Sequence, residues 1–75
     1  MKVFIGSDFK IIPLDSNGII EAEKIVSTRR HVLIQFTEAE HMAMERLQRM
    51  ANDPDPQNHP SQSDMDLLDF YTKYE

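Results

Sequence analysis

Few side chains in this sequence combine the types and the spacing that chemistry at a site requires. Glu38, His41 and Glu45 are three and four residues apart, so a helix would place one imidazole and two carboxylates on one face. These ligands suit a divalent metal, but protein metal sites usually add a second element and an outer shell of hydrogen bonds. The sequence offers neither, so we predict a solvated polar face and no metal.

No arrangement typical of an enzyme accompanies this face. His31 and His59 have no identifiable companions, and two glycines in the chain are too few for a phosphate-binding loop. No pair of carboxylates can be assigned to a cleft either. We therefore predict that the protein is not an enzyme and takes no cofactor.

Carboxylates and tyrosines of the second half are the candidates for binding a partner protein. Two of the acids share the outer face of one expected helix, and two share the outer face of another. Their field would steer a basic surface, and an exposed tyrosine edge would anchor it. The alternative is that the acids are only solvated and the tyrosines belong to the core. The candidates are Glu38, Glu45, Asp66, Asp69, Tyr71 and Tyr74.

A short basic segment offers a different function. Arg29, Arg30 and His31 precede an expected strand, and a basic turn of this kind can hold nucleic-acid phosphate. The alternative is a solvated turn. We keep nucleic-acid binding by these three residues as the second hypothesis.

Charge and composition limit the partners and the compartment. Residues 1–36 carry a net charge of +1 and residues 37–75 a net charge of −6, which gives the overall −5. An acidic half repels nucleic acid and attracts basic surfaces. The chain has no Cys, which fits a reducing compartment, and its N-terminus has no apolar run suited to a signal peptide or membrane span. We predict one cytoplasmic domain over residues 1–75.

The first part of the chain reads as short strands. Strands are expected over residues 2–5 and 9–14, and Pro13 places the second at a sheet edge because it cannot donate a hydrogen bond to a neighbour. Asn17-Gly18 then predicts a hairpin turn. The hairpin favours a strand over residues 19–27, although residues 21–24 on their own prefer helix.

Residues 31–36 (HVLIQF) predict a further strand, and Leu33 on its second face indicates burial on both sides, as for a central strand. The chain then changes period. Thr37 and Glu40 form a capping box that starts a helix over residues 38–52. Its expected apolar stripe consists of Ala39, Met42, Ala43, Leu47, Met50 and Ala51.

Three prolines between residues 52 and 60 end this helix and indicate an extended connector. Ser61 or Ser63 can cap a second helix over residues 64–74. The fold class predicted from these elements is α+β, with a small, mainly antiparallel sheet in residues 2–36 followed by the two helices. The expected core is Phe4, Ile11, Ile25, Val32, Ile34, Phe36, Met42, Leu47, Met50, Leu68 and Phe70.

Part of this pattern resembles a known family. Val32-Leu-Ile-Gln-Phe-Thr-Glu-Ala-Glu-His, Leu47, Met50-Ala51 and Ser61-Gln-Ser-Asp-Met-Asp-Leu-Leu68 are similar to the ribbon-helix-helix repressors, which have a strand, a capped helix, a Ser-rich cap and a second helix. The resemblance covers residues 32–68. It implies a dimeric DNA-binding transcriptional regulator whose paired strands enter the major groove.

Composition favours a different class. Small, acidic, Cys-free proteins without catalytic residues look like the accessory inhibitors of phages and mobile elements, which occupy basic surfaces of nucleic-acid-handling proteins. We therefore predict a protein-binding inhibitor or regulator of a polymerase, nuclease or CRISPR effector. Its expected partner is a protein with a basic surface, together with a second copy in a homodimer, and no membrane. Nucleic acid is a partner only under the repressor hypothesis.

Overall fold

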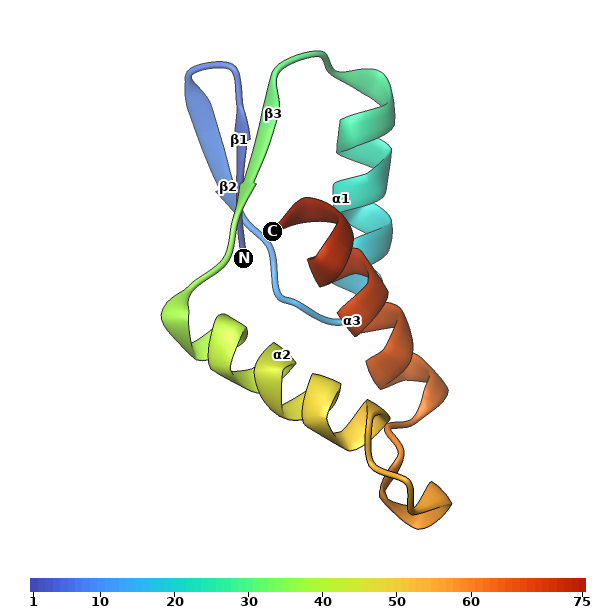
Figure 1. Ribbon diagram of the computed structural model, residues 1–75. Coiled ribbons are helices and arrows are strands. Elements are labelled where there is room, and N and C mark those ends of the chain that lie inside the picture. The colour runs from blue at the N-terminus through green and yellow to red at the C-terminus, as the bar shows by residue number, and fades with distance from the viewer.

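A computed structural model describes all residues from 1 to 75 and shows a three-stranded antiparallel sheet combined with helices (Figure 1). The α+β class is confirmed, but the chain forms three helices where two were predicted. The elements in chain order are β1 (Lys2–Ile5), β2 (Asp8–Ile11), α1 (Ser16–Thr28), β3 (Val32–Gln35), α2 (Glu38–Ala51), the short 3-10 helix η1 (Pro56–Asn58) and α3 (Gln62–Tyr74).

The sheet has the order β2-β1-β3, and β1 pairs antiparallel with both neighbours. β2 lies at an edge, as predicted, but it ends at Ile11, so Pro13 lies outside the strand that was expected to reach residue 14. The prediction of a central strand at residues 31–36 is wrong, because β1 takes the centre and β3 keeps one unpaired edge. Leu33 is exposed rather than buried on a second face.

Residues 19–27 form most of helix α1, so the predicted hairpin and strand are wrong. Asp15 is the N-cap, and its Oδ1 accepts a hydrogen bond from the amide of Gly18 at 2.7 Å. Gly18 is needed for close packing in the first helical turn, since a Cβ there would lie 1.8 Å from the carbonyl oxygen of Pro13. The helical preference of residues 21–24 therefore prevails, and Ala22 is fully buried.

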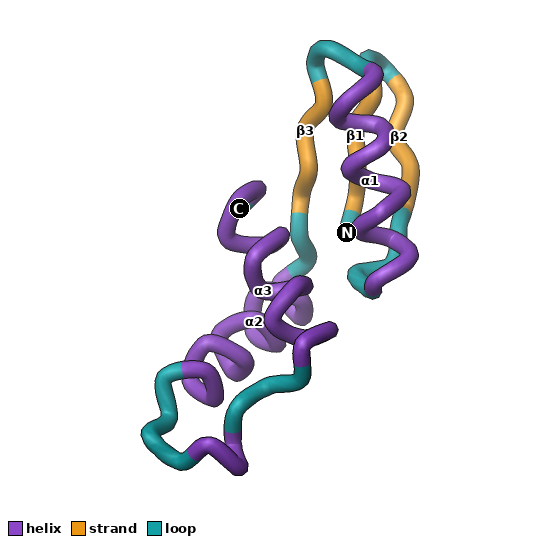
Figure 2. Tube along the Cα trace, turned by 90° about the vertical axis from the view of Figure 1, so that its right-hand side faces the viewer, coloured by secondary structure: helices purple, strands orange, loops and turns teal.

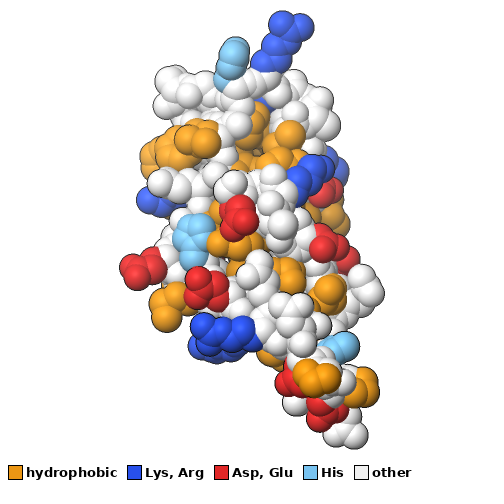
Figure 3. All heavy atoms as spheres, in the orientation of Figure 1, with side chains coloured by type: hydrophobic (Ala, Val, Ile, Leu, Met, Phe, Trp, Pro, Cys, Tyr) orange, Lys and Arg blue, Asp and Glu red, His pale blue; other side chains and the backbone are white.

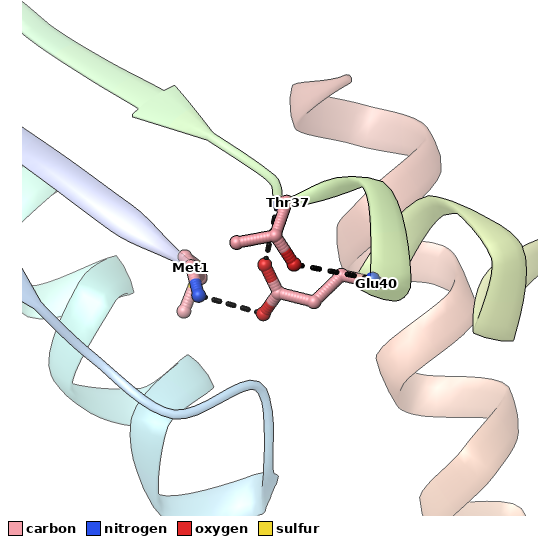
Figure 4. Close-up of polar contacts among 3 residues, drawn as sticks. All are labelled: Met1, Thr37 and Glu40. Carbon is pink, nitrogen blue, oxygen red and sulfur yellow. Dashed lines mark hydrogen bonds and ion pairs between the residues drawn. The ribbon is translucent and has the colours of Figure 1, made fainter.

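The capping box at the start of α2 is confirmed. Thr37 Oγ1 accepts from the amide of Glu40 at 3.2 Å, and Glu40 Oε1 accepts from the amide of Thr37 at 2.7 Å. Glu40 Oε2 also accepts from the Met1 ammonium at 2.6 Å (Figure 4). One carboxylate thus joins the start of the sheet to the start of α2.

The inward face of α2 differs from the predicted stripe. The less exposed positions of α2 are Glu40, Met44, Leu47, Met50 and Ala51, with Met44 buried. Met42 was predicted in the core but is 59% exposed, because it lies away from this inward line. Ala39 and Ala43 are exposed as well.

α3 follows the prediction closely, whereas the connector is not extended throughout, because Pro56–Asn58 form η1. Asp55 caps η1, and the side chain of Ser61 accepts from the amide of Asp64 at 3.3 Å to cap α3. α3 begins two residues earlier than predicted. It lies beside both α1 and α2, so the third helix docks against the other two (Figures 1 and 2).

The core lies between the sheet and the helices. Its buried side chains are Met1, Val3, Ile12, Ala22, Ile34, Phe36, Met44, Leu68, Phe70 and Tyr71. Four predicted members are buried, namely Ile34, Phe36, Leu68 and Phe70. Five are partly buried, namely Phe4, Ile25, Val32, Leu47 and Met50. Besides Met42, Ile11 is a wrong assignment, because β2 turns this side chain away from α1 and leaves it 68% exposed.

One face of the sheet is not covered by a helix. α1 lies over the face that carries Val3 and Ile34 (Figure 2). The opposite face carries Phe4, Phe9 and Leu33, which pair directly across the strands. Hydrophobic side chains gather on this side of the strands, at the upper left of Figure 3.

Candidate protein-binding groove

The α1–α3 groove is the largest hollow of the molecule, with a volume of about 390 Å³. α1 and α3 each contribute four residues at intervals of three, one and three, which places each set on one helical face. The lining residues are Ser16, Ile19, Ile20 and Glu23 of α1, and Asp66, Asp69, Phe70 and Lys73 of α3. Each wall is therefore one face of one regular helix.

Carboxylates dominate the charge of the groove. Glu23 stands on one wall and Asp66 and Asp69 stand on the other, against the single cation of Lys73. Asp66 accepts a hydrogen bond from the side-chain amide of Gln62 at 3.1 Å, and Lys73 Nζ lies 5.2 Å from the centre of the Tyr74 ring. No salt bridge neutralises the three acids, so their negative field faces the groove.

The remaining lining of the groove is apolar. Phe70 is buried and packs against Tyr74 with ring centres 4.8 Å apart, while Ile19 is partly buried. Ile20 leaves 53% of its surface exposed, although it is a large aliphatic residue. Apolar surface between carboxylates suits a ligand that has both an aliphatic stem and a positive tip.

Two of the four predicted acids lie in this groove, and two do not. Asp66 and Asp69 line it, whereas Glu38 and Glu45 are exposed on α2 and are absent from its walls. Acidic side chains are spread over the α2 and α3 half of the surface in Figure 3. The four acids therefore share one half of the molecule but not one site.

The predicted exposed edge at Tyr71 is wrong. Its ring is 6% exposed and packs against Phe36, with centres 4.9 Å apart, and its hydroxyl is hydrogen bonded to Nδ1 of His41. Burial, followed by the nearby carboxylates of Glu75 and Glu45, raises the pKa of the Tyr71 phenol. Tyr71 thus belongs to the α2–α3 interface.

Tyr74 is partly buried beside the groove, where it rests on Phe70. It is not a lining residue of the groove. Its ring instead supports Lys73, whose ammonium lies over it. Of the two predicted tyrosines, only Tyr74 therefore has a place near the acidic pair.

The basic candidates lie at the opposite end of the molecule from η1. Arg29, Arg30 and His31 surround a shallow hollow together with Ile5, the last residue of β1, and Gly6 of the β1–β2 turn. All three are exposed, and basic and His side chains stand out at the top of Figure 3. β3, which follows them, pairs with β1 along one edge and leaves its other edge unpaired.

Sequence reasoning missed the α1 wall of the groove because residues 19–27 were assigned to a strand. In a strand, Ile19 and Glu23 would share a face without Ile20, so the helical set could not be recognised. The signal that identifies the helix is Asp15 as an N-cap, followed by helix-favouring residues 21–24.

Other kinds of site find no support in the geometry. No group of three His, Cys, Asp or Glu side chains is arranged to hold a metal ion, and His41 is engaged with Tyr71. None of the helices is long and apolar enough to cross a membrane.

Comparison with models of known protein families, with curated proteins and with solved structures gives no match.

Proposed function

We propose that the protein is a protein-binding module that holds a basic surface element of its partner in the α1–α3 groove. The observation that carries this proposal is the combination of three carboxylates with an exposed aliphatic side chain in one groove. Solubility alone explains scattered surface acids, but here three acids line one groove together with Ile19, Ile20 and Phe70.

The ligand chemistry follows from the lining. An Arg or Lys side chain would lay its methylene stem on Ile20 and place its charged end between Glu23 and Asp66 or Asp69. The volume of about 390 Å³ is enough for a few side chains rather than for a folded domain. The groove therefore suits one or two basic side chains presented by a helix or loop of the partner.

A nucleic-acid-handling protein is the partner class that this chemistry favours. Polymerases, nucleases and CRISPR effectors expose Arg and Lys where they hold phosphate. A chain with net charge −5 that covers such residues competes with nucleic acid for the same surface. The protein would then act as an inhibitor or regulator, of the kind that phages and mobile elements encode.

The test begins with affinity capture from the native host, followed by binding kinetics with the captured protein. In the double variant Asp66→Lys/Asp69→Lys, association should slow at least tenfold and should depend less on salt. The matched control is Glu38→Lys/Glu45→Lys, which makes the same change in net charge outside the groove. If both double variants slow association by the same factor, the groove is not the site and only the net charge of the protein affects binding.

Nucleic-acid binding is the second candidate, because Arg29, Arg30 and His31 lie together and exposed at one end. Retention on heparin at low salt separates the two functions. The protein-binding proposal expects the chain to flow through. Retention that is abolished by Arg29→Ala/Arg30→Ala would favour the nucleic-acid function instead.

A further inference from the structure

The uncovered face of the sheet carries two rows of side chains. Phe9, Phe4 and Leu33 form the first row, since they are direct partners in the strand register. Ile11, Lys2 and Gln35 form the second row in the same way. We call the four hydrophobic residues of these rows, namely Phe4, Phe9, Ile11 and Leu33, the apolar sheet face.

Three of these four side chains are largely exposed, and Phe4 is partly buried between them. Phe9, Leu33 and Ile11 leave 61%, 64% and 68% of their surface accessible, and the rings of Phe4 and Phe9 lie 6.2 Å apart. Together the three expose roughly 350 Å² of mostly apolar surface, given typical side-chain areas. A contiguous patch of this size compares with the largest apolar patch of a typical monomer, which is often functional.

The charge of this face differs from that of the groove. Neither row contains a carboxylate, and Lys2 is the single charged residue of the two rows. The basic partner proposed for the groove would thus find no electrostatic attraction here. The face belongs to residues 1–36, whose net charge is +1, so two copies can meet here while their acidic halves point away.

We propose that the apolar sheet face is a self-association surface, on which a second copy of this chain packs sheet against sheet. A twofold axis that runs across the strands, between the two rows, sets Phe9 against Ile11 of the second copy. It also sets Phe4 against the aliphatic stem of Lys2, so no like charges meet. The same patch then serves both copies, as a twofold interface requires.

The area agrees with a weak but specific dimer. Two copies of the patch remove roughly 700 Å² of apolar surface, which is about the apolar share of an interface of 1,200 Å², the lower limit for stable association. We therefore expect a dimer with a micromolar dissociation constant. This surface does not overlap the lining of the α1–α3 groove, so the dimer and the proposed protein partner can coexist.

The small core gives a second reason for a covered sheet. Only 11 of 75 residues are buried, and the radius of gyration is 13.4 Å. A compact chain of this length has a radius of gyration of about 11 Å. Sheet-on-sheet packing would place a second apolar layer on a sheet that has one covered face at present.

Sedimentation equilibrium from about 1 to 500 µM tests the proposal, with the melting temperature measured over the same range. The wild-type chain should shift from monomer to dimer, and its melting temperature should rise with concentration. Leu33→Asp should remain monomeric and lose the concentration dependence. The matched control is Ile20→Asp, which places the same charge on an exposed hydrophobic residue in the groove and should still dimerise.

Because the chain has no Cys, a second measurement is available if Leu33→Asp fails to fold. Phe9→Cys and Ile20→Cys each introduce one exposed thiol, to be linked by a short bismaleimide. Phe9→Cys should give covalent dimers at least tenfold faster than Ile20→Cys. Equal rates, or a wild-type chain that stays monomeric at 500 µM, would overturn the proposal. A partner protein that binds at Leu33 while the wild-type chain stays monomeric would overturn it too.

Discussion

Glu40 is the residue that most directly joins the sheet to the helices. Its carboxylate accepts from the Met1 ammonium and from the amide of Thr37. Burial by itself raises the pKa of Glu40, but the hydrogen bonds from the Met1 ammonium and Thr37, with the ammonium's charge, outweigh it, so this pKa lies below its ordinary value. Its contribution to stability is therefore that of an ionised group.

This shift predicts a pH dependence. The stability contributed by Glu40 is fully present above its unfolded-state pKa of about 4.3 and is lost as pH falls through the lower folded-state pKa. Glu40→Gln should reduce the free energy of unfolding at pH 7 by about 1–2 kcal/mol. It should also flatten the loss of stability below pH 5. Urea melts from pH 3 to 7 measure both effects, and parallel curves for the two proteins would contradict this role.

Gly18 gives a second prediction at the scale of one residue. Gly18→Ala should reduce the free energy of unfolding by more than about 2 kcal/mol, because the new methyl would meet backbone atoms of Pro13, which cannot move aside cheaply. Asn17→Ala is the control in the same turn and should stay within about 0.5 kcal/mol, since Asn17 is exposed. Equal denaturation midpoints for the two variants would contradict the close packing of Gly18 at the start of α1.

At the scale of elements, local signals explain what could be predicted. The capping box at Thr37 and the cap at Ser61 fix two helix starts through contacts within four residues. The first was predicted from the sequence, and Ser61 was one of two alternatives for the second. Asn17-Gly18 led to the wrong prediction of a hairpin, because both hairpin turns and first helical turns accept these residues. The difference depends on Asp15 and on the close approach to Pro13, and the latter is visible only in three dimensions.

The rotation of α2 could not be read from its sequence. Ala39, Met42 and Ala43 make as good an apolar stripe as the true inward line, and the contact between Glu40 and Met1 spans 39 residues along the chain. The α1–α3 groove was predicted only in part, because it too depends on packing between segments that are far apart in the sequence. Asp66 and Asp69 were identified on α3, but the opposite wall depends on which segment packs beside it.

Two methionines of α2 test this rotation. Met44→Ala should lower the free energy of unfolding by about 2–5 kcal/mol, because Met44 is buried. Met42→Ala should change it by less than about 0.5 kcal/mol in the monomer, because Met42 is exposed. Denaturant melts at low protein concentration compare them directly. A larger loss of unfolding free energy for Met42→Ala than for Met44→Ala would instead support the apolar stripe predicted from the sequence.

At the scale of the whole molecule, the surface charge changes from basic to acidic along the longest dimension. The chain measures 45 × 21 × 16 Å, with the basic tip at one end and the acidic helices toward the other. The two proposed contacts should consequently respond to salt in opposite ways. Partner binding in the groove should weaken, since salt screens attraction, while self-association should strengthen, since salt screens repulsion between two chains of net charge −5.

Sedimentation at about 20 and 500 mM NaCl checks the second half of this prediction, and binding kinetics with the captured partner check the first. The dimer fraction should rise with salt by a modest factor, because the apolar contact itself is insensitive to screening. A dimer that dissociates in high salt would instead indicate that charged groups hold the two copies together.

α3 is shared between the groove and the core, and this arrangement makes ligand binding and folding thermodynamically linked. One side of the helix places Leu68 and Tyr71 in the core, and the other presents Asp66 and Asp69 to the groove. A thirteen-residue helix is marginal unless it is docked. Any molecule that occupies the groove should therefore raise the melting temperature, so thermal-shift screening with basic peptides can identify ligands before a partner is known.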